Sequence, residues 1–231
     1  MSASVPTLLA VAHGTREPAG APAIAALLAG VRKQVPGVIV DVAYVDVQEP
    51  RLERVLATAC GPVVLVPLFL ASGYHVRVDI PTVVATVGRS DVSVADPLGP
   101  DPAVVAAVAD RHAAAMGPRL GDAIVLAAAG SSDARARADV ELAAARLRDL
   151  LTVSVTAAYV TSAEPRVAEA VAALRTDGCR SVSIATYLLA PGMFTAALQD
   201  AGADAVAAPI GDHPEVVALI VRRYLATVDG S

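Results

Sequence analysis

The chain has 231 residues, a formal net charge of −5, and 55% hydrophobic but only 3% aromatic residues. An acidic surface with few aromatic rings for stacking argues against nucleic-acid binding. No apolar run reaches the roughly 18 residues needed to cross a bilayer, and the N-terminus lacks the basic stretch of a signal peptide. We therefore expect a cytoplasmic protein with no nucleic-acid and no membrane partner.

The chain contains an internal repeat. Three segments of the first half align with three of the second: 43–51 with 158–166, 70–73 with 189–192, and 96–99 with 208–211. A duplication in a chain of this length predicts two domains of similar fold. We place them at residues 1–117 and 118–231, with the linker at 117–121, where Gly and Pro gather.

Continuous apolar runs bounded by turn residues predict four strands in each copy. They lie at residues 6–12, 38–45, 63–70 and 92–95, and again at 123–129, 153–160, 181–188 and 203–207. Near-continuous Val, Ile and Leu is typical of strands buried on both faces, which favours parallel sheets. We expect an α/β protein with two tandem, Rossmann-like open domains, each with a mostly parallel four-stranded sheet flanked by helices.

Helices are predicted between these strands, at residues 21–35, 50–59, 101–116, 134–151, 165–175 and 213–226, and residues 72–81 form a loop leading into a helix. Pro50 and Pro165 suit the first turn of a helix. Asp101 and His213, each followed by proline, are expected to begin the last helix of each copy.

Two cysteines and two of the four histidines are assigned structural roles. Cys60 and Cys179 precede strands in equivalent positions, so we interpret them as small core residues and not as a disulfide. His112 and His213 lie near the ends of predicted helices, where they serve as structural or capping groups.

Three polar residues follow the first three predicted strands: His13, Asp46 and His75. Parallel α/β sheets bind ligands beyond the carboxyl ends of their strands, so the three side chains are expected to converge there. Each has an ordinary structural interpretation: the histidines as hydrogen-bonded structural residues, the aspartate as a loop acid or a helix cap. The second copy carries Ala129, Thr161 and Phe194 at these positions. Their joint loss favours one active site and one inactive copy, although the second copy could instead have filled these positions with core residues.

Two histidines and a carboxylate suit a borderline divalent metal such as Fe²⁺, Co²⁺, Ni²⁺ or Zn²⁺. The chain has no His-x-x-x-His pair, which argues against the common zinc hydrolases. The histidine phosphatases carry an arginine before their nucleophilic histidine, but here that residue is Ala12. The residues themselves therefore indicate a metal site, with a hydrolase or phosphatase as a disfavoured alternative.

Three motifs resemble those of the class II chelatases, and in particular of the sirohydrochlorin chelatases. They are His-Gly-Thr-Arg at 13–16, Ala-Tyr-Val-Asp-Val-Gln-Glu-Pro at 43–50, and Pro-Leu-Phe-Leu-Ala-Ser-Gly-Tyr-His-Val-Arg-Val-Asp-Ile-Pro at 67–81. The third motif is long and specific. The resemblance covers nearly the whole chain, because the long form of that family is two fused α/β halves with one active half.

The resemblance implies insertion of Fe²⁺ or Co²⁺ into sirohydrochlorin, in sirohaem or cobalamin synthesis, without ATP or an organic cofactor. His13 and His75 match the metal-facing, catalytic histidines of the family. Asp46 stands where relatives commonly have Glu, and would act as third ligand or proton relay. The second half is expected to form the opposite wall of the site.

The carboxylates of such a substrate need donors, and its flat ring needs an apolar surface. The candidate substrate-binding residues are Thr15, Arg16, Ser72, Gly73, Arg77, Met193 and Phe194. For each arginine, a solvated surface role is an equally good interpretation. A non-catalytic metal- or tetrapyrrole-binding and delivery protein stays open as the alternative function, and we expect a monomer, since one chain carries both halves.

Overall fold

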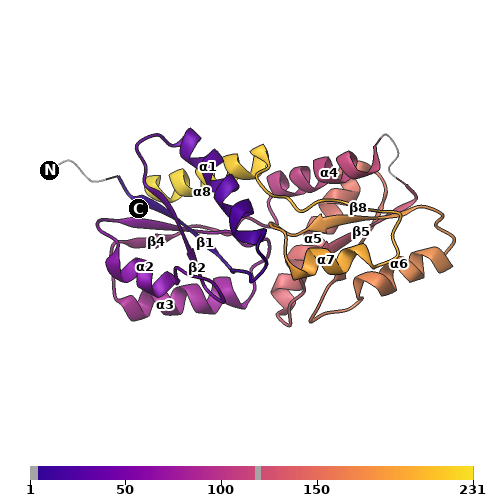
Figure 1. Cartoon of the computed structure of the whole chain (residues 1–231), viewed down its shortest axis with the longest axis horizontal. Coiled ribbons are helices and arrows are strands. Elements are labelled where there is room, and N and C mark those ends of the chain that lie inside the picture. The colour runs from indigo at the N-terminus through magenta and orange to yellow at the C-terminus, as the bar shows by residue number, and fades with distance from the viewer. Residues whose placement is uncertain (1–4, 118–120, 231) are drawn as a thin grey trace. The chain divides into compact units, whose positions relative to one another are not determined.

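The computed structural model describes residues 5–117 and 121–230, and the chain divides into two compact units of alternating strands and helices (Figure 1). The first unit comprises Met1–Leu98 and Asp212–Ser231, and the second comprises Gly99–Gly211. Each unit is built around one sheet.

The sheet of the first unit is parallel throughout, with strand order β2-β1-β3-β4. Its strands are β1 (Thr7–Ala12), β2 (Val40–Tyr44), β3 (Val63–Pro67) and β4 (Val92–Val94). The two central strands, β1 and β3, are almost completely buried, as their uninterrupted apolar sequences predict for strands covered on both faces.

The sheet of the second unit repeats this arrangement in the order β6-β5-β7-β8, again all parallel. Its strands are β5 (Ala123–Ala128), β6 (Ser154–Tyr159), β7 (Val182–Tyr187) and β8 (Ala205–Val206). The predicted fold class, two tandem α/β domains with four-stranded parallel sheets, is thus confirmed.

Helices flank both sheets. The first unit contains α1 (Gly20–Gln34), α2 (Leu52–Thr58), a π-helical turn η1 (His75–Asp79), α3 (Ile80–Val87) and α8 (Pro214–Asp229). The second contains α4 (Pro102–Met116), α5 (Ala134–Leu151), α6 (Val167–Thr176) and α7 (Met193–Gln199). Helix α7 is not among the helices predicted from the sequence.

The last helix of each sequence copy belongs to the other compact unit. Helix α4 packs on β7 and α5, where the Nε2 of buried His112 lies 2.8 Å from the Ser183 hydroxyl. Helix α8 packs on α1 and β3, and its Tyr224 hydroxyl donates to the Pro6 carbonyl at 2.6 Å. The compact units therefore have other boundaries than the two sequence copies, which divide between residues 117 and 118.

The predicted linker at 117–121 does not separate the units either. Gly117 and Gly121 both belong to the second unit, and residues 118–120 lie outside the described part of the chain. The chain instead passes from one unit to the other between Leu98 and Gly99, and back between Gly211 and Asp212.

The predicted starts of α4 at Asp101 and of α8 at His213 are correct. The predicted places of Pro50 and Pro165 in the first turn of a helix are wrong. Asp101 caps α4 by accepting from the Ala103 amide, and His213 caps α8. The carbonyl of Pro50 instead accepts from the Tyr44 amide at 2.9 Å, which extends the pairing beyond β2. Helix α2 consequently begins only at Leu52, and the same pairing precedes α6 in the second unit.

Both cysteines are free thiols. Cys60 is exposed, so its predicted role as a core residue is wrong, whereas Cys179 is half-buried against the core of the second unit. Within the described residues, no helix has the length and apolar character required to cross a bilayer.

Candidate functional site

The loops after the first two strands are joined through their backbones. Beyond the paired strands, the Val45 amide donates to the Ala12 carbonyl and the Asp46 amide to the His13 carbonyl, both at 3.0 Å. Because β1 and β2 are neighbours in a parallel sheet, this pairing brings His13 and Asp46 to the same edge, as the strand pattern predicts.

Gly14 makes this close approach possible. Its φ of +96° lies in the left-handed region, and a Cβ there would stand 2.3 Å from the Asp46 carbonyl oxygen. Any other residue would force the two loops apart. The glycine of the His-Gly motif therefore positions the histidine loop against the aspartate loop.

The two histidines predicted to bind metal lie in contact. The His13 and His75 ring centroids are 4.6 Å apart with the rings nearly perpendicular, at 86°. Phe69, just beyond β3, stacks on His75, with the two ring centroids 5.9 Å apart. His13 is exposed and His75 half-buried, so at least one ring is open to an incoming ligand.

Each histidine places its Nδ1 beside an oxygen atom. The His75 Nδ1 lies 2.6 Å from Oδ2 of Asp79, and the His13 Nδ1 lies 3.0 Å from the Gly14 carbonyl oxygen. The Asp79 contact was not predicted. Its signal in the sequence is a spacing of four residues, which places two side chains on one face of a helical turn.

Asp46 is exposed and does not contact the histidine pair as a ligand would. Its Oδ1 accepts from the Val47 amide at 2.8 Å and lies 3.6 Å from Nη1 of Arg51. The hydrogen bond from the Val47 amide, together with the electrostatic influence of His13 and Arg51, outweighs desolvation and holds the pKa of the Asp46 carboxyl below its usual value. The side chain is therefore ionised at neutral pH.

The predicted three-ligand set is only partly assembled. Within residues 5–117 and 121–230, no group of three or more His, Cys, Asp and Glu side chains has the geometry to hold a metal ion. The structure brings His13 and His75 together and leaves Asp46 beside Arg51. The roles of these three residues in metal binding and catalysis stay predictions.

The predicted substrate-binding residues of the first unit are close to His13 or His75 in the sequence. Arg16 and Arg77 are exposed, and Ser72 and Gly73 are half-buried. The Thr15 amide donates to Oε1 of Gln48 at 3.2 Å, which is a further tie between the two loops.

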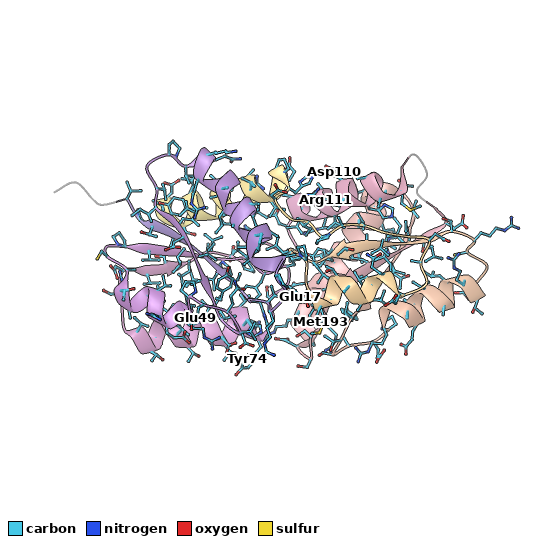
Figure 2. All side chains as sticks on the ribbon, in the orientation of Figure 1. Glu17, Glu49, Tyr74, Asp110, Arg111 and Met193 are labelled. Atoms are coloured by element: carbon cyan, nitrogen blue, oxygen red, sulfur yellow. The ribbon has the colours of Figure 1, made fainter. Side chains whose placement is uncertain are left out.

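The predicted apolar residues Met193 and Phe194 begin α7 of the second unit. Met193, labelled in Figure 2, is 68% exposed, whereas Phe194 is half-buried. In the first unit, Tyr74, also labelled there, has the equivalent place before His75 and is 62% exposed. An exposed apolar side chain is thus kept at this position in both copies.

The equivalent edge of the second unit keeps the backbone and lacks the imidazoles. Gly130 has a φ of +102°, and a Cβ there would meet the Thr161 carbonyl oxygen. Ala129 and Phe194 stand in the histidine positions.

Comparison with known proteins identifies the same duplication. The model of the CbiX family matches the chain twice, over residues 7–115 and 123–227. The sirohydrochlorin ferrochelatase of Bacillus subtilis is 28% identical over 195 residues, which cover 80% of this chain and 75% of that protein. The sirohydrochlorin cobaltochelatase of Methanococcoides burtonii is 30% identical over 80 residues, 33% of this chain and 61% of that protein.

A solved structure shares the fold along the whole chain. The structure of SirB from Bacillus subtilis with Fe³⁺ superposes with a TM-score of 0.82 at 26% identity, covering 98% of each chain. Together with the double match over most of the sequence, this shows that the chain belongs to the CbiX family.

Proposed function

We propose that this protein is a sirohydrochlorin chelatase, an enzyme that inserts a divalent metal ion into sirohydrochlorin. The observation that carries the proposal is the contact between the His13 and His75 imidazoles at the strand edge of the first unit. Both relatives described above are named for this reaction, one with iron and one with cobalt. The metal is a substrate here.

Metal insertion releases two protons from the pyrrole nitrogens, so the site needs a metal ligand that can also accept a proton. Neutral imidazole is a good ligand for Fe²⁺ and Co²⁺, and its ordinary pKa of about 6.5 lets it take up a proton near neutral pH. His13 and His75 present the metal to the ring. As bonds from the metal to the pyrrole nitrogens replace its bonds to imidazole, the imidazole nitrogens that are released accept the two pyrrole protons.

Asp46 has a narrower role in this mechanism. Because its pKa is held low, its carboxylate is a weak proton acceptor at neutral pH. Its negative charge balances that of the metal, either as a third ligand or through water. The low pKa therefore favours a role as metal ligand over the other predicted role, that of proton relay.

The remaining predicted residues bind the macrocycle. Arg16 and Arg77, both exposed and each next to a histidine motif, supply charged donors to the substrate carboxylates. Thr15, Ser72 and the Gly73 amide add neutral donors. Met193 and Phe194 of the second unit offer apolar contact to the ring.

The finer aspects of the function are also proposals. We propose a cytoplasmic monomer that uses Fe²⁺ or Co²⁺ and needs no organic cofactor. Two histidines and an aspartate do not discriminate between these metals, because their ligand preferences are close.

The test is anaerobic absorbance of sirohydrochlorin mixed with Co²⁺ or Fe²⁺, with wild-type protein, with His13→Ala and without protein. We expect acceleration by the wild type alone, and the relative rates rank the two metals. A wild-type rate equal to the spontaneous rate would overturn the proposal. Tight stoichiometric binding without acceleration would instead identify a binding or delivery protein.

A further inference from the structure

We propose that Asp79 is a positioning residue of the metal site. Its carboxylate holds His75 by Nδ1, so that Nε2 is the ring nitrogen presented to the metal. The inference rests on the proposed function, since it assigns a role toward the metal substrate at the same site.

The contact itself is short and local. Oδ2 of Asp79 lies 2.6 Å from Nδ1 of His75, and the two residues are the first and last of the π-helical turn η1. Both side chains are half-buried, with exposed fractions of 34% and 35%, which limits competition from water. A charge-assisted bond of this length is stronger than a neutral one.

The chemistry of the carboxylate decides which nitrogen carries the proton. An ionised carboxylate only accepts hydrogen bonds, so Nδ1 of His75 must donate. In neutral imidazole the other nitrogen, Nε2, then holds the free lone pair and is the available metal ligand. Histidines that bind metal commonly donate their second N–H to a carboxylate in this way.

A weaker contact favours the same tautomer in His13. Its Nδ1 lies 3.0 Å from the Gly14 carbonyl oxygen, which is also an acceptor only. With both Nδ1 atoms donating, each histidine of the pair has its Nε2 free. The stronger anchor falls on His75, whose ring is further restrained by stacking on Phe69.

The second copy indicates that the fold does not require this carboxylate. The alignment that pairs His75 with Phe194 pairs Asp79 with Leu198, which is 1% exposed in the core of the second unit. The imidazole and the carboxylate are therefore absent together, as expected if Asp79 serves the histidine.

The experiment compares Asp79→Leu, the residue of the second copy, with Asp79→Asn, which keeps an acceptor oxygen. Asp41→Leu is the matched control, because Asp41 is exposed on β2 and bonds the adjacent Val42 amide. Two quantities are measured at about pH 8, where unperturbed imidazole is neutral. They are the His75 tautomer, from ¹H–¹⁵N spectra of the ring, and Co²⁺ affinity, from absorbance titration.

We expect wild-type His75 with its proton on Nδ1. Asp79→Leu should lose that preference and weaken Co²⁺ binding by about 10- to 100-fold, as for other partners of metal-bound histidines. Asp79→Asn should retain most of both, and Asp41→Leu all of both. In turnover, the loss in Asp79→Leu should appear in the KM for the metal and in kcat, with the KM for sirohydrochlorin unchanged.

An Nε2–H tautomer in the wild type would overturn the inference, as would a folded Asp79→Leu protein with unchanged tautomer and Co²⁺ affinity. If Asp79→Leu does not fold, the wild-type tautomer still decides. Neither readout requires turnover. A wild type that shows the Nδ1–H tautomer and binds Co²⁺ but does not accelerate insertion refutes the proposed function and leaves the role of Asp79 intact.

Discussion

The two copies of the repeat share a backbone arrangement at the strand edge and differ in its chemistry. In each, a glycine with positive φ follows the first strand and packs on a carbonyl of the next loop, Gly14 on Asp46 and Gly130 on Thr161. In both copies the same main-chain hydrogen bonds join the loops, from Val45 to Ala12 in the first and from Val160 to Ala128 in the second. The polar groups of the first copy are therefore not needed to build the edge.

The apolar replacements in the second copy support this conclusion. Leu198 is buried in its core, where Asp79 in the first copy contacts a histidine instead. A half-buried carboxylate beside an imidazole stabilises the fold less than a buried leucine beside a half-buried phenylalanine. Their presence in the first copy points to function.

The largest expected effect on turnover comes from replacing His75 with phenylalanine, the residue at the equivalent position of the second copy. His75→Phe should lower catalysed insertion by about 100-fold or more, toward the spontaneous rate, because a ligand and proton acceptor is lost. Absorbance of the metallated product measures the rate. The control is His213→Asn, which alters a helix cap far from the motifs in sequence and should retain turnover. Equal turnover in wild type and His75→Phe would contradict the comparison.

The shared glycines allow the structural and chemical roles of the edge to be separated. Gly14→Ala and Gly130→Ala should each lower the free energy of unfolding by about 1–3 kcal/mol, since both combine positive φ with a Cβ collision. Only Gly14→Ala should also reduce turnover of the folded protein, because it separates His13 from Asp46. Urea unfolding and initial rates measure the two effects.

Gly88→Ala serves as the control for the glycine pair, because Gly88 has a φ of +70° with nothing within 4 Å of the added Cβ. Gly88→Ala should lower the free energy of unfolding by only about 1 kcal/mol, because it adds backbone strain without a collision. A Gly14→Ala protein as stable and as active as Gly88→Ala would argue against the loop contact.

A smaller effect is expected from the apolar residues of the second copy. Met193→Ala and Phe194→Ala should each raise the KM for sirohydrochlorin by about five- to tenfold, the change that follows from losing about 1–1.4 kcal/mol of apolar contact. Leu150→Ala, at another exposed apolar position, is the control. An unaltered KM in both variants would remove the second copy from substrate binding.

The smallest effect concerns the two exchanged helices, which carry buried polar rings at equivalent positions, His112 in α4 and Tyr224 in α8. Burial lowers the pKa of His112, and its Nδ1 has no hydrogen-bond partner among the residues that the structure describes. The unfolded chain therefore binds a proton more readily. Stability should be constant above the unfolded pKa of about 6.5 and fall below it, by up to about 1.4 kcal/mol per pH unit.

The measurement is the urea midpoint between about pH 5 and 7, above the titration of the carboxyl groups, whose unperturbed pKa values are about 4. His112→Phe should lose the pH dependence. Tyr224→Phe should lower stability by about 0.5–1.5 kcal/mol at every pH, since it loses only the hydrogen bond to Pro6. A pH slope unchanged in His112→Phe would assign the titration to another group.

Much of the fold follows from local pattern. Apolar runs such as that of β1 specify buried parallel strands, and an aspartate or histidine before proline specifies where α4 and α8 begin. The placement of His13, Asp46 and His75 at one edge follows from the same pattern, because each comes after a strand of one parallel sheet. The predicted helix start at Pro50 is wrong because proline also suits extended backbone. The hydrogen bond between the Tyr44 amide and the Pro50 carbonyl stabilises the extended conformation here.

The sequence by itself determined the duplication, the strands and the family, and it places His13 and His75 after two strands of one sheet. Tertiary structure alone decided that α4 and α8 belong to opposite units, because an apolar helix face is complementary to either of two similar sheets. It also decided that Asp46 lies beside Arg51 while the rings of His13 and His75 meet. The approach of such side chains depends on how the loops pack in space, whereas the contact of Asp79 with His75 follows from their spacing of four residues within one helical turn.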